Sequence, residues 1–192
     1  IKGEASRKTL IEAALGVFAE RGFARATIKD IGKAAGVSPA LLYHYFQSKD
    51  ELLDAVVEQY GVVDNMRYVV DQLQSEPPEE FLKVFACRLY DLIGERMALV
   101  RIFLQESYSN KTVAEAWRRL LLQGMPLIKS YFERQIVIGL IRPHHVEVTM
   151  RTLAISIIML RFTEPVFPPQ TATGHEYIRQ LVANLYLGIK PD

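Results

Sequence analysis

Three helix starts follow one another within residues 27–53, and this spacing constrains the fold more than any other feature of the chain. Thr27, Ser38 and Ser48 are typical N-cap residues, and Gly36 can supply the left-handed conformation with which helices commonly end. Pro39 suits a first helical turn, because its missing N–H would have no intrahelical partner there. The segment therefore predicts a helix, a tight glycine turn, a short helix over residues 39–46 and then another helix.

The short helix at residues 39–46 cannot be stable alone, so its neighbours must hold it in place. Leu42 and Phe46 are four residues apart and are expected to face the core together. A rigidly held short helix with aromatic and hydrogen-bonding groups outward is typical of helices that enter the major groove of DNA. The residues expected on or beside this outer face are Pro39, Ala40, Leu41, Tyr43, His44 and Tyr45.

Lys49 is unusual in the first turn of the helix that Ser48 begins. A cation there opposes the helix dipole by a few tenths of a kcal/mol or more. A DNA phosphate bound at this helix end would reverse the sign of that effect. A solvated lysine that tolerates a small penalty is the alternative, and the residue alone leaves both interpretations open.

Charge is unevenly distributed along the 192 residues, although the net charge is only +1. Residues 1–50 carry eight Lys and Arg against five Asp and Glu, a local +3, and the remainder carries fifteen against seventeen, a local −2. A basic N-terminal part on a mildly acidic remainder fits nucleic-acid binding at one end. No signal peptide is visible, and the apolar stretch at residues 153–160 is far shorter than the ~18 residues of a membrane span. We therefore expect a soluble, cytoplasmic protein with no membrane partner.

The remaining pattern predicts an all-α protein, because no stretch shows the alternation typical of strands. An N-terminal head of three helices is expected, the first over residues 6–21, on a larger helical body. A long helix over residues 49–74 should join head and body. The other expected helices cover residues 79–108 with an interruption near Gly94, 112–138 with a kink at Pro126, 146–162 and 175–187.

The last two helices are apolar on more than one face, whereas a surface helix needs only one apolar stripe. A second apolar face requires burial inside the subunit or a partner surface. We favour a homodimer formed by these helices through a four-helix interface. The residues predicted in that interface are Leu153, Ile157, Leu160, Ile178, Leu181 and Leu185.

No catalytic motif, phosphate-binding glycine loop or metal-ligand spacing is present, so the sequence predicts no enzyme activity, no cofactor and no metal. Cys87 is the single cysteine and is expected to be a small core residue. His144 and His145 are adjacent and are expected on the surface near a helix start. The body combines aromatic and polar residues that could line a ligand cavity, with Arg88 and Glu106 as the leading candidates because a buried charge needs a partner. The predicted ligand contacts are Tyr60, Phe85, Arg88, Phe103, Glu106, Trp117 and Met125.

The N-terminal quarter resembles the DNA-binding head of TetR-family transcriptional regulators. The resemblance rests on Gly36-Val37-Ser38, on Leu42-Tyr43-His44-Tyr45-Phe46 followed by Ser48-Lys49, and on the preceding segment at residues 23–26. It implies an all-helical homodimer with a ligand cavity in each body. It also implies that Thr27 and Lys49 hold phosphates while Pro39, Ala40, Tyr43 and His44 lie against bases or backbone. Arg25 and Ser38 complete the predicted DNA-binding set.

These inferences predict a DNA-binding domain at residues 1–48 and a ligand-binding and dimerisation domain at residues 49–192. The predicted function is transcriptional regulation, as a repressor that a small molecule bound in the body releases from its DNA operator. A ligand-independent regulator or an activator is the alternative within this class. A helical carrier or enzyme that shares only the head fold is a further alternative, and it would show no salt-dependent DNA binding.

Overall fold

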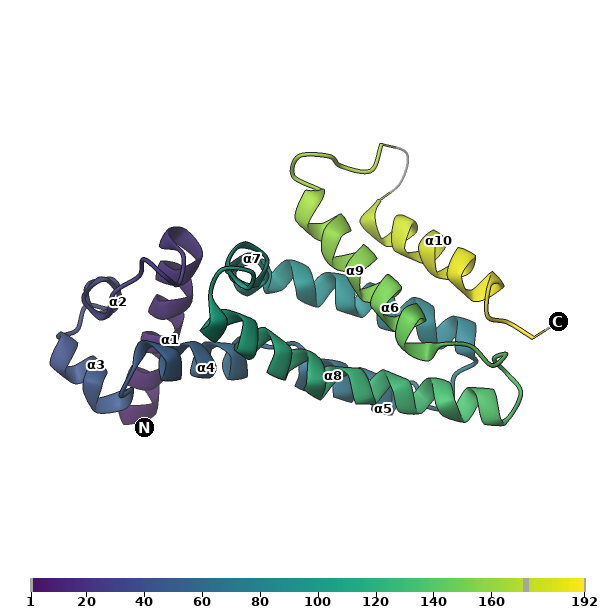
Figure 1. The fold of residues 1–192 in the computed structure, drawn as a ribbon, viewed down its shortest axis with the longest axis horizontal. Helices are drawn as coiled ribbons and strands as arrows, with labels where there is room; N and C mark the ends of the chain where they lie inside the picture. The colour runs from purple at the N-terminus through teal and green to yellow at the C-terminus, as the bar shows by residue number, and fades with distance from the viewer. Residues whose placement is uncertain (1, 171–172, 192) are drawn as a thin grey trace. The chain divides into compact units, whose positions relative to one another are not determined.

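The computed structural model describes residues 2–170 and 173–191, and these ranges contain ten helices and no strand (Figure 1). The prediction of an all-α fold is therefore confirmed. The helices are α1 (Lys2–Arg21), α2 (Ile28–Ala35), α3 (Pro39–Tyr45), α4 (Lys49–Tyr60), α5 (Val63–Gln72), α6 (Pro78–Glu95), α7 (Met97–Glu106), α8 (Lys111–Val137), α9 (Val146–Thr163) and α10 (Gly174–Leu187). None of the helices in the described ranges is both long enough and apolar enough to cross a membrane.

The chain forms two compact units. The head unit comprises residues up to Gly61 together with Arg96–Leu121, and the body unit comprises Val62–Glu95 and the residues from Leu122 onward. The head unit thus extends beyond the domain predicted at residues 1–48, because α4, α7 and the first part of α8 share its core. Helix α8 is the one element that contributes residues to both units among those that the structure describes.

In the head unit, α1 packs against α2, α4 and α7. Its core is a continuous apolar cluster that includes side chains from every helix of the unit, such as Phe18, Ile31, Leu42, Leu53 and Phe103. Burying this apolar surface is the main stabilising contribution to the short helices α2 and α3, which are too short to be stable alone.

In the body unit, α6 is central and packs against α5, α9 and α10. Phe81 of α6 stacks on Tyr131 of α8, with ring centroids 3.5 Å apart. The Tyr131 hydroxyl donates to the carbonyl oxygen of Glu76 at 3.1 Å, and burial raises the pKa of Tyr131 to about 12. This aromatic cluster holds α8 against the start of α6.

The single helix predicted over residues 49–74 is wrong, because α4 ends at Tyr60 and α5 begins at Val63. Gly61 separates them in an extended conformation. An added Cβ at Gly61 would lie 2.6 Å from the Val57 carbonyl oxygen and 2.9 Å from Leu120 Cδ1, so this close approach needs glycine. The apolar pattern continues through the break, which is why periodicity alone did not reveal it.

The other predicted boundaries agree with the structure to within two residues, except that α1 begins at Lys2 and not at residue 6. The interruption expected near Gly94 is confirmed, because α6 ends at Glu95 and α7 begins at Met97. Helix α8 includes Pro126, whereas the predicted kink there stays a prediction.

The two histidines and the cysteine that the sequence singles out lie only partly as expected. His145 is the exposed N-cap residue of α9, but His144 is only partly exposed, and its Nδ1 lies 2.9 Å from the Arg142 carbonyl oxygen. Cys87 is only partly buried and lines a surface groove instead of lying in the core.

Three of the six predicted interface residues are wrong. Leu153, Ile157 and Ile178 are buried within the subunit's own core and present no surface to a partner. Both faces of α9 and α10 are apolar, so the sequence did not show which face turns inward. Leu160, Leu181 and Leu185 are partly exposed and stay predictions. The strongly exposed apolar side chains of α9, α10 and the segment between them are Val148, Ile155, Met159, Val166, Phe167, Tyr177 and Leu187.

Gly36 ends α2 with φ +68°, in the left-handed region, and its backbone N–H donates to the carbonyl oxygens of α2. No atom lies within 4 Å of the position of an added Cβ, so only the backbone conformation would oppose a larger residue. We expect Gly36→Ala to lower the free energy of unfolding by about 1–2 kcal/mol, because L-residues disfavour this region. Urea denaturation should show a smaller loss for Gly36→Asn, since asparagine tolerates the left-handed region better. Equal losses for both variants would contradict this explanation.

Candidate nucleic-acid interface

Helix α3 has only seven residues, and its start is strongly defined. The Ser38 hydroxyl accepts a hydrogen bond from the Leu41 amide at 3.2 Å, and Pro39 occupies the first turn. The N-cap and first-turn proline that the sequence predicts are therefore confirmed. The Ser38 cap gives the Leu41 N–H a partner that the helix itself lacks at its start. Pro39 has no N–H that needs a partner, and its ring already fixes φ near the helical value.

Two buried side chains fix α3 against the head unit. Leu42 and Phe46 are 0% and 1% exposed, as their spacing predicts. The Phe46 amide donates to the Leu42 carbonyl oxygen at 2.9 Å and closes the helix. The Arg7 guanidinium carbon of α1 lies 5.2 Å from the centroid of the Phe46 ring. The helix is therefore braced on its inner side by both apolar and cation–π contacts.

The opposite face of α3 is open to solvent. Tyr43 is 55% exposed and Leu41 38% exposed, and Pro39, Ala40 and His44 are also exposed. Tyr45 is only partly exposed, and its ring meets that of His44 edge-on at 5.3 Å between centroids. The predicted outward orientation of Pro39, Ala40, Tyr43 and His44 is confirmed, and their contacts with DNA stay a prediction.

The start of α2 is fixed by a reciprocal capping box around Thr27, the N-cap residue that the sequence predicts. Thr27 Oγ1 accepts from the Asp30 amide at 3.1 Å and donates to Asp30 Oδ2 at 2.6 Å. The hydrogen bond from the Thr27 side chain and the nearby Arg21 hold the pKa of Asp30 below its usual value. Because its proton points to Asp30, Thr27 would have to redirect its hydroxyl to donate to the phosphate predicted there.

Neither interpretation of Lys49 from the sequence matches the structure. Its ammonium group is neither solvated nor free for a phosphate, because Nζ donates to the carbonyl oxygens of Phe23, Ala24 and Ala26 at 2.7, 3.3 and 3.0 Å. It also lies 4.5 Å from the centroid of the Phe23 ring. Three acceptors account for the three N–H donors of the ammonium. The sequence does not show this role, since the partners are backbone atoms 23–26 residues away.

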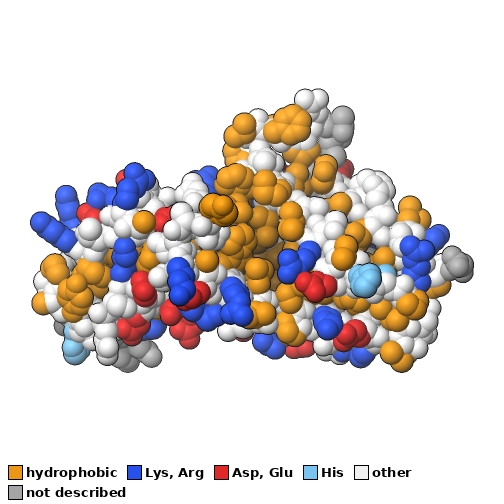
Figure 2. Space-filling model, viewed as in Figure 1, with side chains coloured by type: hydrophobic (Ala, Val, Ile, Leu, Met, Phe, Trp, Pro, Cys, Tyr) orange, Lys and Arg blue, Asp and Glu red, His pale blue; other side chains and the backbone are white. Residues whose placement is uncertain are grey.

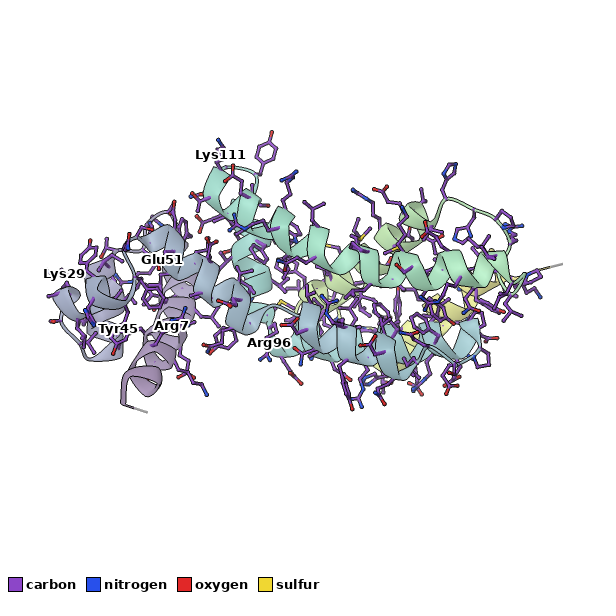
Figure 3. The ribbon with its side chains drawn as sticks, turned by 90° about the horizontal axis from the view of Figure 1, so that it is seen from below. Arg7, Lys29, Tyr45, Glu51, Arg96 and Lys111 are labelled. Carbon is purple, nitrogen blue, oxygen red and sulfur yellow. The ribbon has the colours of Figure 1, made fainter. Side chains whose placement is uncertain are left out.

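The head unit also presents exposed basic side chains. Arg25 is exposed, and its Nε donates to the Arg21 carbonyl oxygen at 2.9 Å. Figure 3 places Arg7, Lys29 and Tyr45 at the same end of the head unit. Arg7 and Lys29 lie outside the predicted DNA-binding set, although positive charge is the sequence signal that indicates a phosphate contact. Cations so placed can contact phosphates, whereas α3 carries the side chains that can reach base edges.

Four of the predicted ligand contacts lie in the head unit, where each has a protein partner. Phe103 and Trp117 stack with centroids 5.6 Å apart, and the Arg96 guanidinium lies 5.6 Å from the Tyr60 ring centroid. Glu106 accepts hydrogen bonds from backbone amides at the end of α1. The expectation that Glu106 pairs with Arg88 or with a ligand is therefore wrong, because backbone N–H groups already satisfy its charge.

The other three predicted ligand contacts lie in the body unit and are not brought together there. Phe85 is buried and stacks on Phe81, and Met125 is partly exposed on α8. Arg88 is exposed and lines a surface groove of about 760 Å³ between α6 and α10. This groove carries charges of both signs and has no buried apolar lining typical of a small-molecule cavity.

Comparison with known proteins identifies the head. Residues 10–56 match the family of bacterial regulatory proteins described as the tetR family. The chain is 29% identical over 152 residues to the HTH-type transcriptional repressor KstR2 of Mycobacterium tuberculosis, a match that covers 70% of this chain and 73% of KstR2. Residues 10–56 form a TetR-family domain. With this domain, and like KstR2, the chain is a DNA-binding regulator of transcription.

Further transcriptional regulators resemble this chain over shorter or more divergent stretches. The HTH-type transcriptional regulator BetI of Rhizobium meliloti is 49% identical over 113 residues, which cover 58% of this chain and 48% of BetI. The crystal structure of the transcriptional regulator FadR from Bacillus subtilis, in complex with stearoyl-CoA, superimposes with a TM-score of 0.78 at 20% identity. That match covers 94% of this chain and 98% of FadR, and shows that the two share a fold.

Proposed function

We propose that α3 is the helix by which this TetR-family regulator reads its operator in the major groove of DNA. The observation that carries the proposal is a seven-residue helix with a fixed inner face and an open outer face. Leu42 and Phe46 are fully buried, whereas Tyr43 on the same helix is 55% exposed. The fixed inner face holds this helix in place, and the exposed aromatic side chain on its outer face is free to contact DNA.

The chemistry of the outer face suggests a mixed mode of recognition. Pro39, Ala40 and Leu41 offer apolar contacts of the kind that fit thymine methyl groups. Tyr43 and His44 offer hydrogen-bonding groups to base edges or to the backbone. Arg25, Arg7 and Lys29 would position the head through phosphates, which contributes affinity but no direct sequence information. Lys49 is excluded from this set because its ammonium is occupied by carbonyl oxygens.

We further propose that two copies bind one operator together. Two heads in successive major grooves require half-sites about 34–36 Å apart. The exposed apolar side chains of α9 and of the segment that follows it supply a surface on which two body units could associate, and Figure 2 shows hydrophobic side chains gathered there. An isolated apolar patch of this kind on a monomer would be unfavourable in water.

We propose finally that a small molecule bound in the body weakens operator binding, so that the protein acts as a releasable repressor. FadR, which shares the fold, was crystallised with stearoyl-CoA, which supports a ligand-responsive body in this chain. Coupling between two such sites typically amounts to about 1–3 kcal/mol, and complete reversal of a two-state equilibrium requires nearer ~5.5 kcal/mol. Mass spectrometry of small molecules that co-purify with the protein would identify the effector. A protein that binds DNA with no such molecule and no response to added ones would instead be a ligand-independent regulator.

Tyr43→Ala tests the assignment of α3. We expect operator affinity to fall roughly tenfold, because one side chain at a base edge typically contributes about 1–3 kcal/mol. Fluorescence anisotropy would measure binding to a labelled duplex that the wild-type protein has selected from a random-sequence library. The thermal midpoint should stay close to that of the wild type, since an exposed side chain contributes little to folding.

Tyr68→Ala is the matched control, because Tyr68 is an exposed tyrosine of α5 in the body unit. It should leave operator affinity unchanged. Equal affinity of wild type and Tyr43→Ala would remove Tyr43 from the reading face. Absence of salt-dependent binding to any duplex would contradict the proposed function as a whole.

A further inference from the structure

The loop between α1 and α2 is held from two sides by opposite charges. It consists of residues 22–27 and ends at Thr27, the N-cap residue of α2. Glu106, the last residue of α7, binds its amide groups, and Lys49, the first residue of α4, binds its carbonyl groups. The loop therefore receives an acceptor and a donor from helices that are distant in sequence.

The carboxylate of Glu106 bridges two successive backbone N–H groups. The Phe23 amide donates to Oε1, and the Ala24 amide donates to Oε2 at 2.9 Å. Successive N–H groups that point the same way form a small anion-binding concavity, and hydrogen bonds from them to a carboxylate are charge-assisted. Here the anion is a side chain of the same unit.

Gly22 provides the space for this carboxylate. Its φ of +81° places it in the left-handed region, and an added Cβ would lie 2.6 Å from Glu106 Oε1. The backbone conformation therefore favours glycine at this position, and a Cβ there would displace the Glu106 carboxylate from the loop. The backbone of the loop is thus shaped to receive the carboxylate.

Two apolar anchors complete the arrangement. Phe23 and Ala26 are each only 2% exposed and belong to the core of the head unit. Glu106 binds the Phe23 N–H and Lys49 binds the Phe23 carbonyl oxygen, so three separate contacts, with the buried ring, determine the position of this residue. The loop leads directly into Thr27, so its position sets where α2 begins.

We propose that Glu106 is a positioning residue for DNA binding: with Lys49 it fixes the loop at residues 22–27, and so the presentation of α2 and α3 to the operator. This role rests on the function proposed above. In this role neither Glu106 nor Lys49 contacts DNA. Helix α7 begins at Met97, one residue after α6 ends at Glu95. Phe103 of α7 stacks on Trp117 of α8, so the helix that carries Glu106 is itself held in place. A shift of α7 along its axis would withdraw the carboxylate from both amides at once.

Glu106→Ala and Glu106→Gln test this proposal, with Glu115→Ala as the matched control. Glu115 is an exposed acidic residue of α8 in the same unit, and its ion pair is with Lys111 on its own helix. Hydrogen exchange would measure protection of the amides at residues 23–27, and anisotropy would measure affinity for the duplex selected by the wild type. Both are measured at a temperature at which circular dichroism shows every variant to be folded.

We expect Glu106→Ala to lose protection of the Phe23 and Ala24 amides and to bind the duplex about tenfold more weakly, as for loss of charge-assisted hydrogen bonds. Glu106→Gln keeps one side-chain acceptor and should lie between Ala and wild type. The dependence of affinity on salt concentration should keep its slope, because no phosphate contact is removed. Glu115→Ala should match the wild type in both measurements.

The outcomes separate this proposal from the function on which it rests. Unchanged amide protection in Glu106→Ala would overturn the proposal that Glu106 fixes the loop at residues 22–27. Lost protection with unchanged affinity, or with only a lower thermal midpoint, would show that Glu106 has a merely structural role and would overturn its role in DNA binding. If the wild type enriches no duplex, the proposed function fails, whereas hydrogen exchange still shows whether Glu106 fixes the loop.

Discussion

Ile155→Asp is expected to convert the proposed dimer into monomers and to weaken operator binding by about 10²–10⁴-fold. Ile155 is 58% exposed near the middle of α9. It lies seven residues after Val148 and four before Met159, which are also exposed, so the three side chains follow one face of the helix. A carboxylate in the centre of that apolar face would be buried without a partner in the dimer.

The loss of affinity follows from geometry, because a monomer can place only one head on a half-site. In a dimer the second head binds at a high effective concentration, and this gain disappears when the subunits separate. Sedimentation velocity would give the oligomeric state, and anisotropy with the selected duplex would give the affinity. The fold should be retained, since the substitution is at the surface.

Val137→Asp is the control for this prediction. Val137 lies at the end of α8 and is 84% exposed, but it is outside the proposed dimer surface. The Val137→Asp variant should remain dimeric and bind DNA as the wild type does. A dimeric Ile155→Asp would move the interface away from this face of α9, and a monomeric wild type would contradict the dimer itself.

Leu42→Ala is expected to lower the free energy of unfolding of the head unit by about 2–5 kcal/mol, the range for removal of a buried leucine side chain. Leu42 is completely buried and belongs to the same cluster as Phe46. Because α3 has only seven residues, it has few other contacts with which to compensate for a cavity. Urea denaturation followed by circular dichroism would measure the change, and operator affinity should fall with it.

Leu41→Ala is the natural comparison, because the same side chain is removed at the neighbouring position. Leu41 is 38% exposed, so its truncation should cost less than about 1 kcal/mol of stability. Any effect on DNA affinity should therefore exceed its effect on folding. Equal destabilisation by the two variants would contradict the orientation of α3.

The head could be predicted well from sequence because its determinants are local. Thr27, Gly36, Ser38 and Ser48 each act on atoms within about one helical turn, and such signals are readable along the chain. The structure places all four where the sequence predicts them, as caps of α2, α3 and α4. The inward pair Leu42 and Phe46 follows from the helical repeat alone.

The contacts that the sequence did not reveal are those between distant backbone and side-chain atoms. Lys49 and Glu106 bind main-chain groups, and main-chain groups are the same in every residue, so no residue type marks the partner. Leu153 and Ile157 were assigned to a partner because both faces of α9 are apolar, and only packing decides which face is internal. The break at Gly61 depends in part on a contact with Leu120, which is equally invisible along the chain.

Helix α8 has a practical consequence for protein engineering. Its residues up to Leu121 belong to the head unit and those from Leu122 onward to the body unit. A chimera that gives another regulator this operator specificity would have to carry residues 96–121 together with the N-terminal 61, and so needs three junctions. Two of them fall between helices, but the third lies inside α8, where an insertion or deletion of one residue would rotate all later side chains by about 100°.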